Sequence, residues 1–294
     1  MSSTSSLQNK VAVITGGSRG IGQAVGDALI RQGARVVIGD ILDAEGQKVA
    51  EAWNMNAGKK VAAYAHCDVT KYKDLRALFA LAEHAFGGVD IAILNAGIGD
   101  GANAILTPMD DEEDMKIYQI NVGGVVKGTK VALLHMAKRG GGAIVNTASI
   151  ASFFTMNGLN AYNATKHAVM GWTRSLDHLQ EVCNVRVNAV CPFWVDTDMI
   201  HGELLSGEVA EYMSKTPKTT MPIVVDAFMQ CITDNNINGE TLMCLPSGIE
   251  AQARIEPHPS MFDDQTMALL PRMMVTQQER LKKELAEARA RANI

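Results

Sequence analysis

Short apolar runs alternate with helical patterns along most of the chain, and this alternation constrains the fold more than any other feature of the sequence. The first run, residues 11–15, is rich in β-branched side chains and gives way to a helix-period segment over residues 20–32. Strands this apolar are buried on both faces, so we expect a parallel sheet covered by helices through right-handed crossovers. The sequence therefore predicts a single doubly wound α/β domain with a parallel sheet of about seven strands and helices on both faces. Strands are predicted at 11–15, 35–40, 61–68, 91–95, 143–147, 185–191 and 240–245, and helices at 20–32, 43–53, 73–86, 112–139 and 161–181.

Length and composition agree with one large domain. The chain has 294 residues, of which 47% are hydrophobic and 20% charged, which is enough for a sizeable core. Its net charge of −5 and the lack of a long basic run argue against nucleic acid as a partner. The start is polar and no apolar stretch could cross a bilayer, so we expect no membrane partner and a cytoplasmic location. The five cysteines and seven histidines form no Cys-x-x-Cys or His-Glu-x-x-His pattern, so no metal site is predicted.

The two ends of the chain differ from its middle. We predict a flexible N-terminus over residues 1–9, the α/β domain over 10–249 and an extension over 250–294. The extension should carry a charged helix from about residue 276 to about residue 292. Residues 261–274 are apolar enough to bury, and we expect them to pack across a subunit or over the mouth of the binding pocket.

The turn after the first predicted strand reads Thr-Gly-Gly-Ser-Arg-Gly-Ile-Gly over residues 15–22. Small residues let this backbone turn tightly and approach a pyrophosphate, which the N–H groups of the following helix can bind. Asp40 ends the second strand, where a carboxylate accepts the ribose 2′-hydroxyl and repels a 2′-phosphate. We therefore predict a Rossmann-type site for NAD, with Arg19 as the feature that would instead favour NADP. The predicted contacts in these elements are Gly16, Ser18, Arg19, Gly20, Ile21, Gly22 and Asp40.

Tyr162 and Lys166 stand at positions i and i+4 of a predicted helix, so their side chains share one face. A lysine ammonium at this spacing, together with a cationic nicotinamide, lowers the pKa of the phenol and makes it usable as an acid or base. Ser149 follows the preceding strand, where its hydroxyl can donate to a developing oxyanion. These residues indicate hydride-transfer chemistry, in which a carbinol loses its hydroxyl proton as the hydride leaves.

From about residue 8 to about residue 249 the chain resembles the short-chain dehydrogenase/reductases. Residues 15–22 fit the family's glycine-rich signature. Asp68 and Val69 fit its adenine contact, and Asn95, Ala96 and Gly97 fit the motif after its fourth strand. The catalytic tetrad of the family is matched by Asn121, Ser149, Tyr162 and Lys166.

The resemblance implies a role for each member of the tetrad. Tyr162 would be the acid/base, Ser149 would hold and polarise the reacting oxygen, and Lys166 would bind the nicotinamide ribose and lower the tyrosine pKa. Asn121 would support a proton-relay water, or it could bond backbone where the helix kinks before a Gly-Gly pair. Asn95 is expected to stabilise the sheet.

The segment after the sixth strand departs from the family pattern. Where the family usually has Pro-Gly, this chain has Pro192 and then Phe193, which does not readily take a positive φ, so the loop should run differently. Thr197 still matches the position that contacts the carboxamide, and the resemblance adds Pro192 and Val195 to the cofactor contacts. This loop and the Leu-Pro-Ser-Gly ending at 245–248 look like the hydroxyprostaglandin dehydrogenase branch, which oxidises lipid alcohols with NAD.

Aromatic and methionine side chains gather in loops at the carboxyl ends of the predicted strands, where such sheets bind ligands. We therefore predict NAD(H)-dependent interconversion of a hydrophobic secondary alcohol and its ketone. An NADPH-dependent carbonyl reductase and a non-catalytic dinucleotide-binding sensor or scaffold are the alternatives. The resemblance implies a homodimer or homotetramer. The apolar loop residues are Phe153, Phe154, Met156, Phe193, Trp194, Met199 and Met213.

Overall fold

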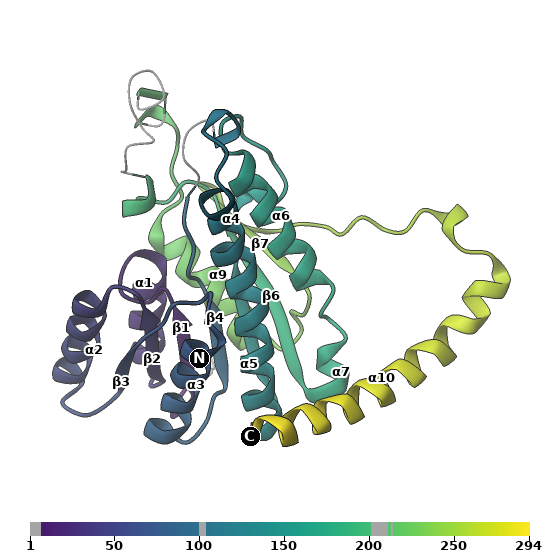
Figure 1. Cartoon of the computed structure of the whole chain (residues 1–294), viewed down its shortest axis with the longest axis horizontal. Coiled ribbons are helices and arrows are strands. Elements are labelled where there is room, and N and C mark those ends of the chain that lie inside the picture. Colours follow the sequence, from purple (N-terminus) through teal and green to yellow (C-terminus); the bar gives the residue numbers. More distant parts are fainter. Residues whose placement is uncertain (1–6, 100–103, 201–210, 213) are drawn as a thin grey trace, which may run out of the picture.

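The computed structural model of the chain describes residues 7–99, 104–200, 211–212 and 214–294 (Figure 1). Seven parallel strands and an antiparallel eighth form one sheet in the order β3-β2-β1-β4-β5-β6-β7-β8. The predicted doubly wound α/β fold is thereby confirmed, and its strand order reverses between β1 and β4. The strands are β1 (Val11–Thr15), β2 (Arg35–Asp40), β3 (Ala62–His66), β4 (Ile91–Leu94), β5 (Gly142–Thr147), β6 (Val185–Pro192), β7 (Thr241–Leu245) and β8 (Gly248–Ala251).

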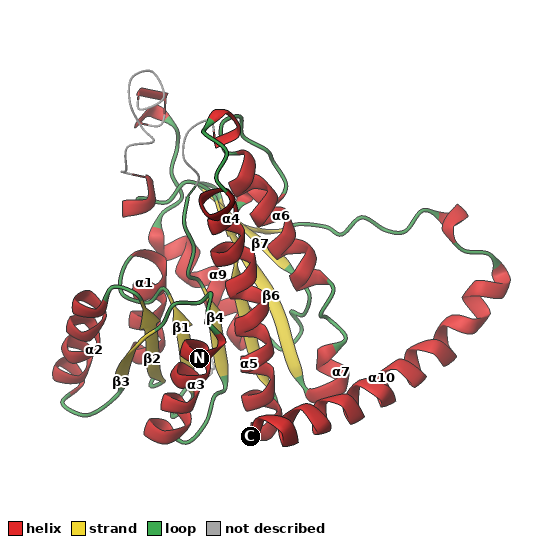
Figure 2. Ribbon diagram, viewed as in Figure 1, coloured by secondary structure: helices red, strands yellow, loops and turns green. Residues whose placement is uncertain are grey.

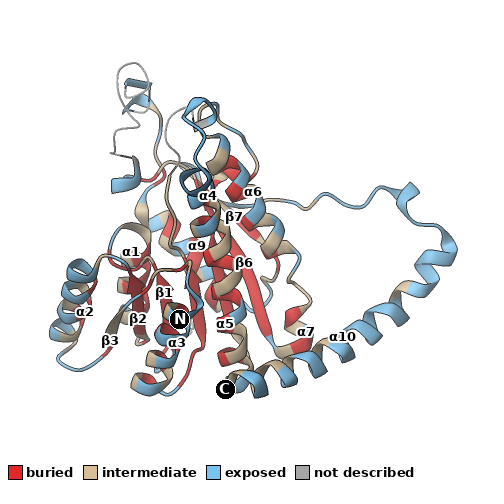
Figure 3. Ribbon diagram, viewed as in Figure 1, coloured by how far each residue is buried: buried red, intermediate tan, exposed pale blue. Residues whose placement is uncertain are grey.

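Helices cover both faces of the sheet (Figures 2 and 3). Successive side chains of a strand point to opposite faces, so Val11 and Val13 join one core cluster while Ala12 and Ile14 join the other. This arrangement explains why the strands are apolar at almost every position. The first cluster includes residues of α3 (Tyr72–Phe86), α5 (Gly124–Arg139) and α6 (Asn160–Arg174), and the second those of α1 (Gly20–Arg31), α2 (Asp43–Ala57) and α9 (Met221–Thr233).

The single helix predicted over 112–139 is wrong in one respect, because it is interrupted. α4 (Asp111–Tyr118) passes into a π-helical turn, η2 (Gln119–Gly123), before α5 begins. The amide of Asn121 in this turn bonds to the backbone of Ile98, which lies outside the helix. A tertiary contact therefore holds the wider turn, and π-helical turns of this kind are frequent at functional sites.

The helix predicted over 161–181 is also shorter than expected. α6 ends at Arg174, and a separate α7 (Leu179–Cys183) follows. Between them the carbonyl oxygen of Asp177 accepts a bond from Asn238 at 2.7 Å, and its carboxylate pairs with Arg254 at 2.8 Å. These bonds fix Asp177 to other parts of the chain. The helix α9 and the strand β8 were not predicted from the sequence.

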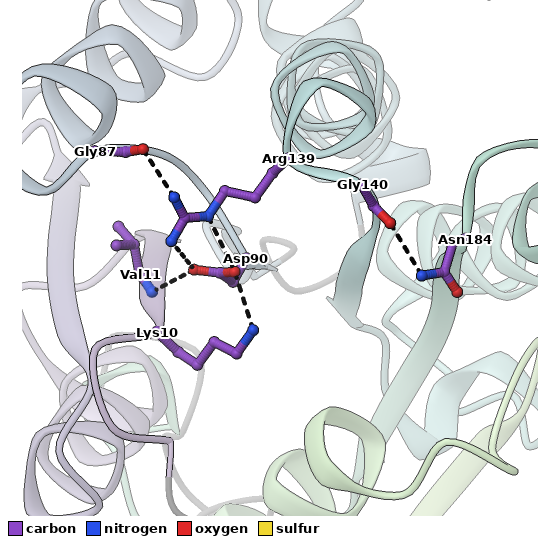
Figure 4. A network of polar contacts seen from close by, with 7 residues as sticks. All are labelled: Lys10, Val11, Gly87, Asp90, Arg139, Gly140 and Asn184. Carbon is purple, nitrogen blue, oxygen red and sulfur yellow. Dashed lines mark hydrogen bonds and ion pairs between the residues drawn. The ribbon is translucent and has the colours of Figure 1, made fainter.

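Asp90, just before β4, organises the amino edge of the sheet (Figure 4). Its carboxylate accepts bonds from the Val11 N–H at 2.9 Å, Lys10 Nζ at 3.2 Å and Arg139 Nε at 3.2 Å. Burial raises the pKa of Asp90, but these bonds outweigh burial and hold the pKa below its ordinary value. A cavity of about 580 Å³ opens beside this network. The carboxylates that line this cavity are paired with neighbouring cations. This pairing indicates that they stabilise the amino edge of the sheet.

The C-terminal helix α10 (Asp264–Ala292) begins earlier than predicted, because Asp263 caps it by accepting the Thr266 N–H at 2.8 Å. Its later turns contact α7 and α5, and Gln278 bonds to Glu181 (Figure 1). Because α7 leads into the start of β6, α10 approaches the amino edge of the sheet. Residues 261–274 themselves are almost all exposed and lie away from the sheet, so the expectation that they cover the pocket mouth is not met (Figure 1). Packing across a subunit stays a prediction, and the exposed apolar side chains include Met261, Phe262, Met267, Leu269, Met273, Met274 and Val275.

Candidate active site

The glycine-rich turn joins β1 to α1 with Gly16 at φ 66° and Gly20 at φ 57°. A Cβ on Gly22 would lie 2.2 Å from the carbonyl oxygen of Gly16, so the first turn of α1 sits directly on the strand end. Ile21 packs against the core. Ser18 Oγ is buried and has no hydrogen-bond partner among the described residues. A helix N-terminus with glycine surroundings and an unsatisfied hydroxyl fits a pyrophosphate.

Asp40 closes β2 beside this turn and is 9% exposed. One carboxylate oxygen accepts the Ser18 N–H at 3.1 Å, and the other accepts the Leu42 N–H at 3.2 Å. The Arg19 guanidinium pairs with the exposed Asp198 carboxylate at 3.2 Å. The Asp40 carboxylate is thus held in place by backbone N–H groups, whereas the Arg19 guanidinium is already engaged in an ion pair.

Asp68 and Val69, the residues matched to the adenine contact, point in different directions. The Asp68 carboxylate accepts the Thr70 N–H at 3.0 Å and pairs with Lys71 at 3.0 Å, which fixes the turn after β3. Val69 is buried, and a Cβ on Gly124 would lie 2.7 Å from its side chain. The side chain of Val69 is therefore part of the core. Only the backbone of Val69 is then available to contact a ligand.

Asn95 ties together the strand ends around the site. Its Nδ2 donates to the carbonyl oxygen of Gly16 at 2.9 Å, and its Oδ1 accepts the Thr147 hydroxyl at 3.1 Å. The next residue, Ala96, donates its N–H to Thr15 Oγ1 at 3.3 Å. These bonds join β1, β4 and β5 at their carboxyl ends, in line with the stabilising role expected for Asn95.

Tyr162, Ser149 and Lys166 meet at the carboxyl edge of the sheet. Lys166 Nζ lies 5.4 Å from the centroid of the Tyr162 ring and donates to the Thr147 carbonyl at 2.9 Å. The Ser149 hydroxyl accepts the Ala151 N–H at 3.2 Å. Burial raises the pKa of Tyr162, and a hydrogen bond with Ser149 opposes this rise. Burial also lowers the pKa of Lys166 to about 8.

Asn121 lies 1% exposed next to this group. Its Oδ1 accepts the Ile98 N–H at 2.9 Å, and its Nδ2 donates to the Ile98 carbonyl at 3.0 Å and to Thr165 Oγ1 at 3.2 Å. A Cβ on Gly97 would lie 3.2 Å from Asn121 Oδ1 and 3.8 Å from Lys166 Nζ, so the glycine keeps this corner open. The side chain of Asn121 is thus occupied by backbone, as the kink interpretation expected.

The loop after β6 borders the site on the other side. Phe193 does not take a positive φ, and its N–H donates to the Cys244 carbonyl at 3.0 Å, which continues the contact with β7. The carbonyl oxygen of Pro192 accepts a hydrogen bond from the Ser149 hydroxyl at 3.5 Å, and Val195 is buried. Thr197 returns to the glycine-rich turn, where a Cβ on Gly20 would lie 3.6 Å from its methyl group.

Two contributors to this site were missed from the sequence. Asp198 forms an ion pair with Arg19, and the carbonyl oxygen of Thr147 accepts a hydrogen bond from Lys166, the candidate catalytic lysine. An acid beside Thr197 was a usable signal for the first, since that loop was expected near the cofactor. A backbone carbonyl leaves no signal in the sequence.

Comparison with known proteins identifies the family. The family model for short chain dehydrogenases matches residues 10–204, and the chain belongs to that family of oxidoreductases. It is 36% identical to zerumbone synthase of Zingiber zerumbet over 205 residues, covering 70% of this chain and 76% of that protein. It is 30% identical to human 15-hydroxyprostaglandin dehydrogenase [NAD(+)] over 274 residues, covering 84% and 95% respectively.

A solved structure gives the same result for the fold. The 3-ketoacyl-(acyl-carrier-protein) reductase of Brucella melitensis, complexed with NADH, superposes with a TM-score of 0.72 at 29% identity. The superposition covers 81% of this chain and 97% of the reductase. The fold of this chain is therefore shared with a reductase whose structure holds NADH.

Proposed function

We propose that the protein interconverts a hydrophobic secondary alcohol and its ketone with NAD(H). The observation that carries this proposal is the meeting of Tyr162, Ser149 and Lys166 beside an open, glycine-lined turn. The cofactor supplies hydride transfer. The carbinol proton passes to Tyr162 in the oxidative direction, and Ser149 donates to the oxygen as its charge develops.

The protonation states of the two basic groups support this division of roles. Without a ligand, burial holds Tyr162 neutral and lowers the pKa of Lys166 to about 8. Lys166 already donates to the Thr147 carbonyl, so its remaining N–H bonds can reach ribose hydroxyls. A positive charge on the bound nicotinamide and on Lys166 would then lower the pKa of the phenol. The side chain of Asn121 fixes the wall of the site. The backbone of Asn121 is then the part of this residue that can bind a relay water.

The preference for NAD is supported by the two charges at the ribose end. A carboxylate at Asp40 favours a 2′-hydroxyl and repels a 2′-phosphate, and Arg19 is engaged by Asp198. We expect NADH to bind more tightly than NADPH in a fluorescence titration. Asp40→Ala should weaken NADH binding roughly tenfold to a hundredfold, as loss of a charged hydrogen bond implies.

Asp198→Asn provides the matched test of Arg19. Freeing the guanidinium should tighten NADPH binding by up to about fivefold and leave NADH unchanged, because an exposed ion pair contributes at most about 1 kcal/mol. Tighter NADPH than NADH binding in the unmodified protein would contradict the assignment and favour the NADPH-dependent carbonyl reductase. Failure to bind either dinucleotide would favour the sensor or scaffold.

An apolar substrate is supported by the side chains around the carboxyl edge. Phe154 is 64% exposed and Met199 46% exposed, and the rings of Phe193 and Trp194 meet edge to face at 6.3 Å. Met213 lies outside the described residues. We expect turnover of apolar secondary alcohols to exceed that of polyols by at least about tenfold in kcat/KM, since each buried methylene contributes about 0.8 kcal/mol. Fast turnover confined to small polyols would remove this part of the proposal.

Location and assembly complete the proposal. All five cysteines are free, which suits a reducing compartment such as the cytoplasm. Among the described helices, none is long and apolar enough to span a membrane. A homodimer or homotetramer would offer cover for the exposed apolar side chains of α10.

A further inference from the structure

Asn163 directly follows the proposed acid/base and is 6% exposed in the first turn of α6. Its Nδ2 donates to the carbonyl oxygen of Met156 at 2.8 Å, and its Oδ1 accepts the Met156 N–H at 3.4 Å. Both ends of the side-chain amide are thus directed at one residue. They bind the two backbone polar groups of Met156 as a neighbouring strand would.

The segment held in this way connects Ser149 to Tyr162. At its start Phe153 packs against the core, and the Arg174 guanidinium lies 5.7 Å from its ring. Of the following side chains Phe154, Thr155 and Asn157 are exposed, with Phe154 at 64%, and Met156 is half-buried. The amide of Asn163 therefore ties the middle of the segment, residues 153–159, to the helix that carries Tyr162.

The backbone of Asn163 is fixed separately from its side chain. Its N–H donates to the Leu159 carbonyl at 2.8 Å, and its carbonyl accepts His167 Nδ1 at 2.8 Å one turn later. Removing the side-chain amide should therefore leave α6 and Tyr162 in place while it releases Met156. This separation makes the side chain testable without loss of the catalytic helix.

We propose that Asn163 is a positioning residue that fixes segment 153–159 as a wall of the substrate site, so that Phe154 and Met156 can receive a bulky apolar group. The inference rests on the proposed function for the nature of the substrate. An amide is needed at this position because a carboxylate has no N–H to donate to the Met156 carbonyl. We call the pair of hydrogen bonds between Asn163 and Met156 the clamp. The KM of a small substrate that does not reach the wall should not change when the clamp is removed.

The kinetic test compares a bulky and a small secondary alcohol, 4-phenyl-2-butanol and 2-butanol. Asn163→Ala and Asn163→Asp should raise the KM for 4-phenyl-2-butanol about tenfold, as loss of one buried hydrogen bond implies. The KM for 2-butanol, the kcat for both alcohols and the NADH Kd should stay within about twofold. Asn56→Ala, which removes an exposed amide from α2, is the control and should change none of these values.

Hydrogen exchange provides a readout that does not depend on turnover. In Asn163→Ala the amides of residues 153–159 should exchange faster than in the unmodified protein, with α6 unchanged. Unchanged exchange in the segment, or an equal loss for both alcohols, would overturn the inference. If the unmodified protein oxidises neither alcohol while the exchange difference is present, the proposed function fails and the clamp stands.

Discussion

Tyr162→Phe is expected to lower kcat by roughly a hundredfold to ten-thousandfold, the range that general acid–base catalysis contributes. The substitution removes one hydroxyl and keeps the ring that lies 5.4 Å from Lys166 Nζ. NADH should therefore bind with an affinity within about twofold of the unmodified protein. The measurement is steady-state oxidation of an apolar secondary alcohol, together with the NADH fluorescence titration.

A matched control distinguishes a chemical effect from a structural one. Tyr72→Phe removes a hydroxyl from a partly exposed tyrosine at the start of α3, whose ring lies 5.8 Å from Lys127 Nζ, and should leave both readouts unchanged. Ser149→Ala should produce a loss of similar size, and the double variant should lose little more, because groups that act together are not additive. Activity retained by Tyr162→Phe would assign the proton transfer to another group.

The parts of the fold that follow from local pattern could be predicted from the sequence. A strand buried on both faces is apolar at nearly every position, so β1 and β2 were predicted with the bounds they have. The turn at 15–22 was equally readable, because left-handed backbone and close helix packing require glycine at particular positions. The positions of Tyr162 and Lys166 on one helix face followed from the helical repeat.

The parts that depend on distant contacts could not be predicted. The π-helical turn at Gln119–Gly123 is held by bonds between Asn121 and Ile98, and the end of α6 by bonds to Asp177. Periodicity within one segment carries no information about such bonds. The Arg19–Asp198 pair joins residues 179 positions apart, and it changes the interpretation of Arg19 from a 2′-phosphate contact to a partnered cation.

Lys166→Met is expected to stabilise the ligand-free protein by about 3 kcal/mol below pH 8, although it should abolish turnover. Lys166 is 5% exposed, and burial lowers its pKa from 10.5 to about 8. The folded state therefore binds fewer protons than the unfolded state between these values. The cost of burying the charge is present in full below pH 8 and is lost as the pH rises toward 10.5.

Urea unfolding of both proteins between pH 6.5 and pH 9.5 tests this expectation. The stability difference should be largest at the acidic end and fall by about half at the alkaline end. Lys48→Met, on the exposed side of α2, is the control and should change stability by less than about 0.5 kcal/mol at any pH. A difference that does not vary with pH would mean that the variant acts through packing. A stability difference with the expected pH dependence would show that the buried charge of Lys166 lowers folding stability, a cost that a role in the chemistry of Tyr162 would explain.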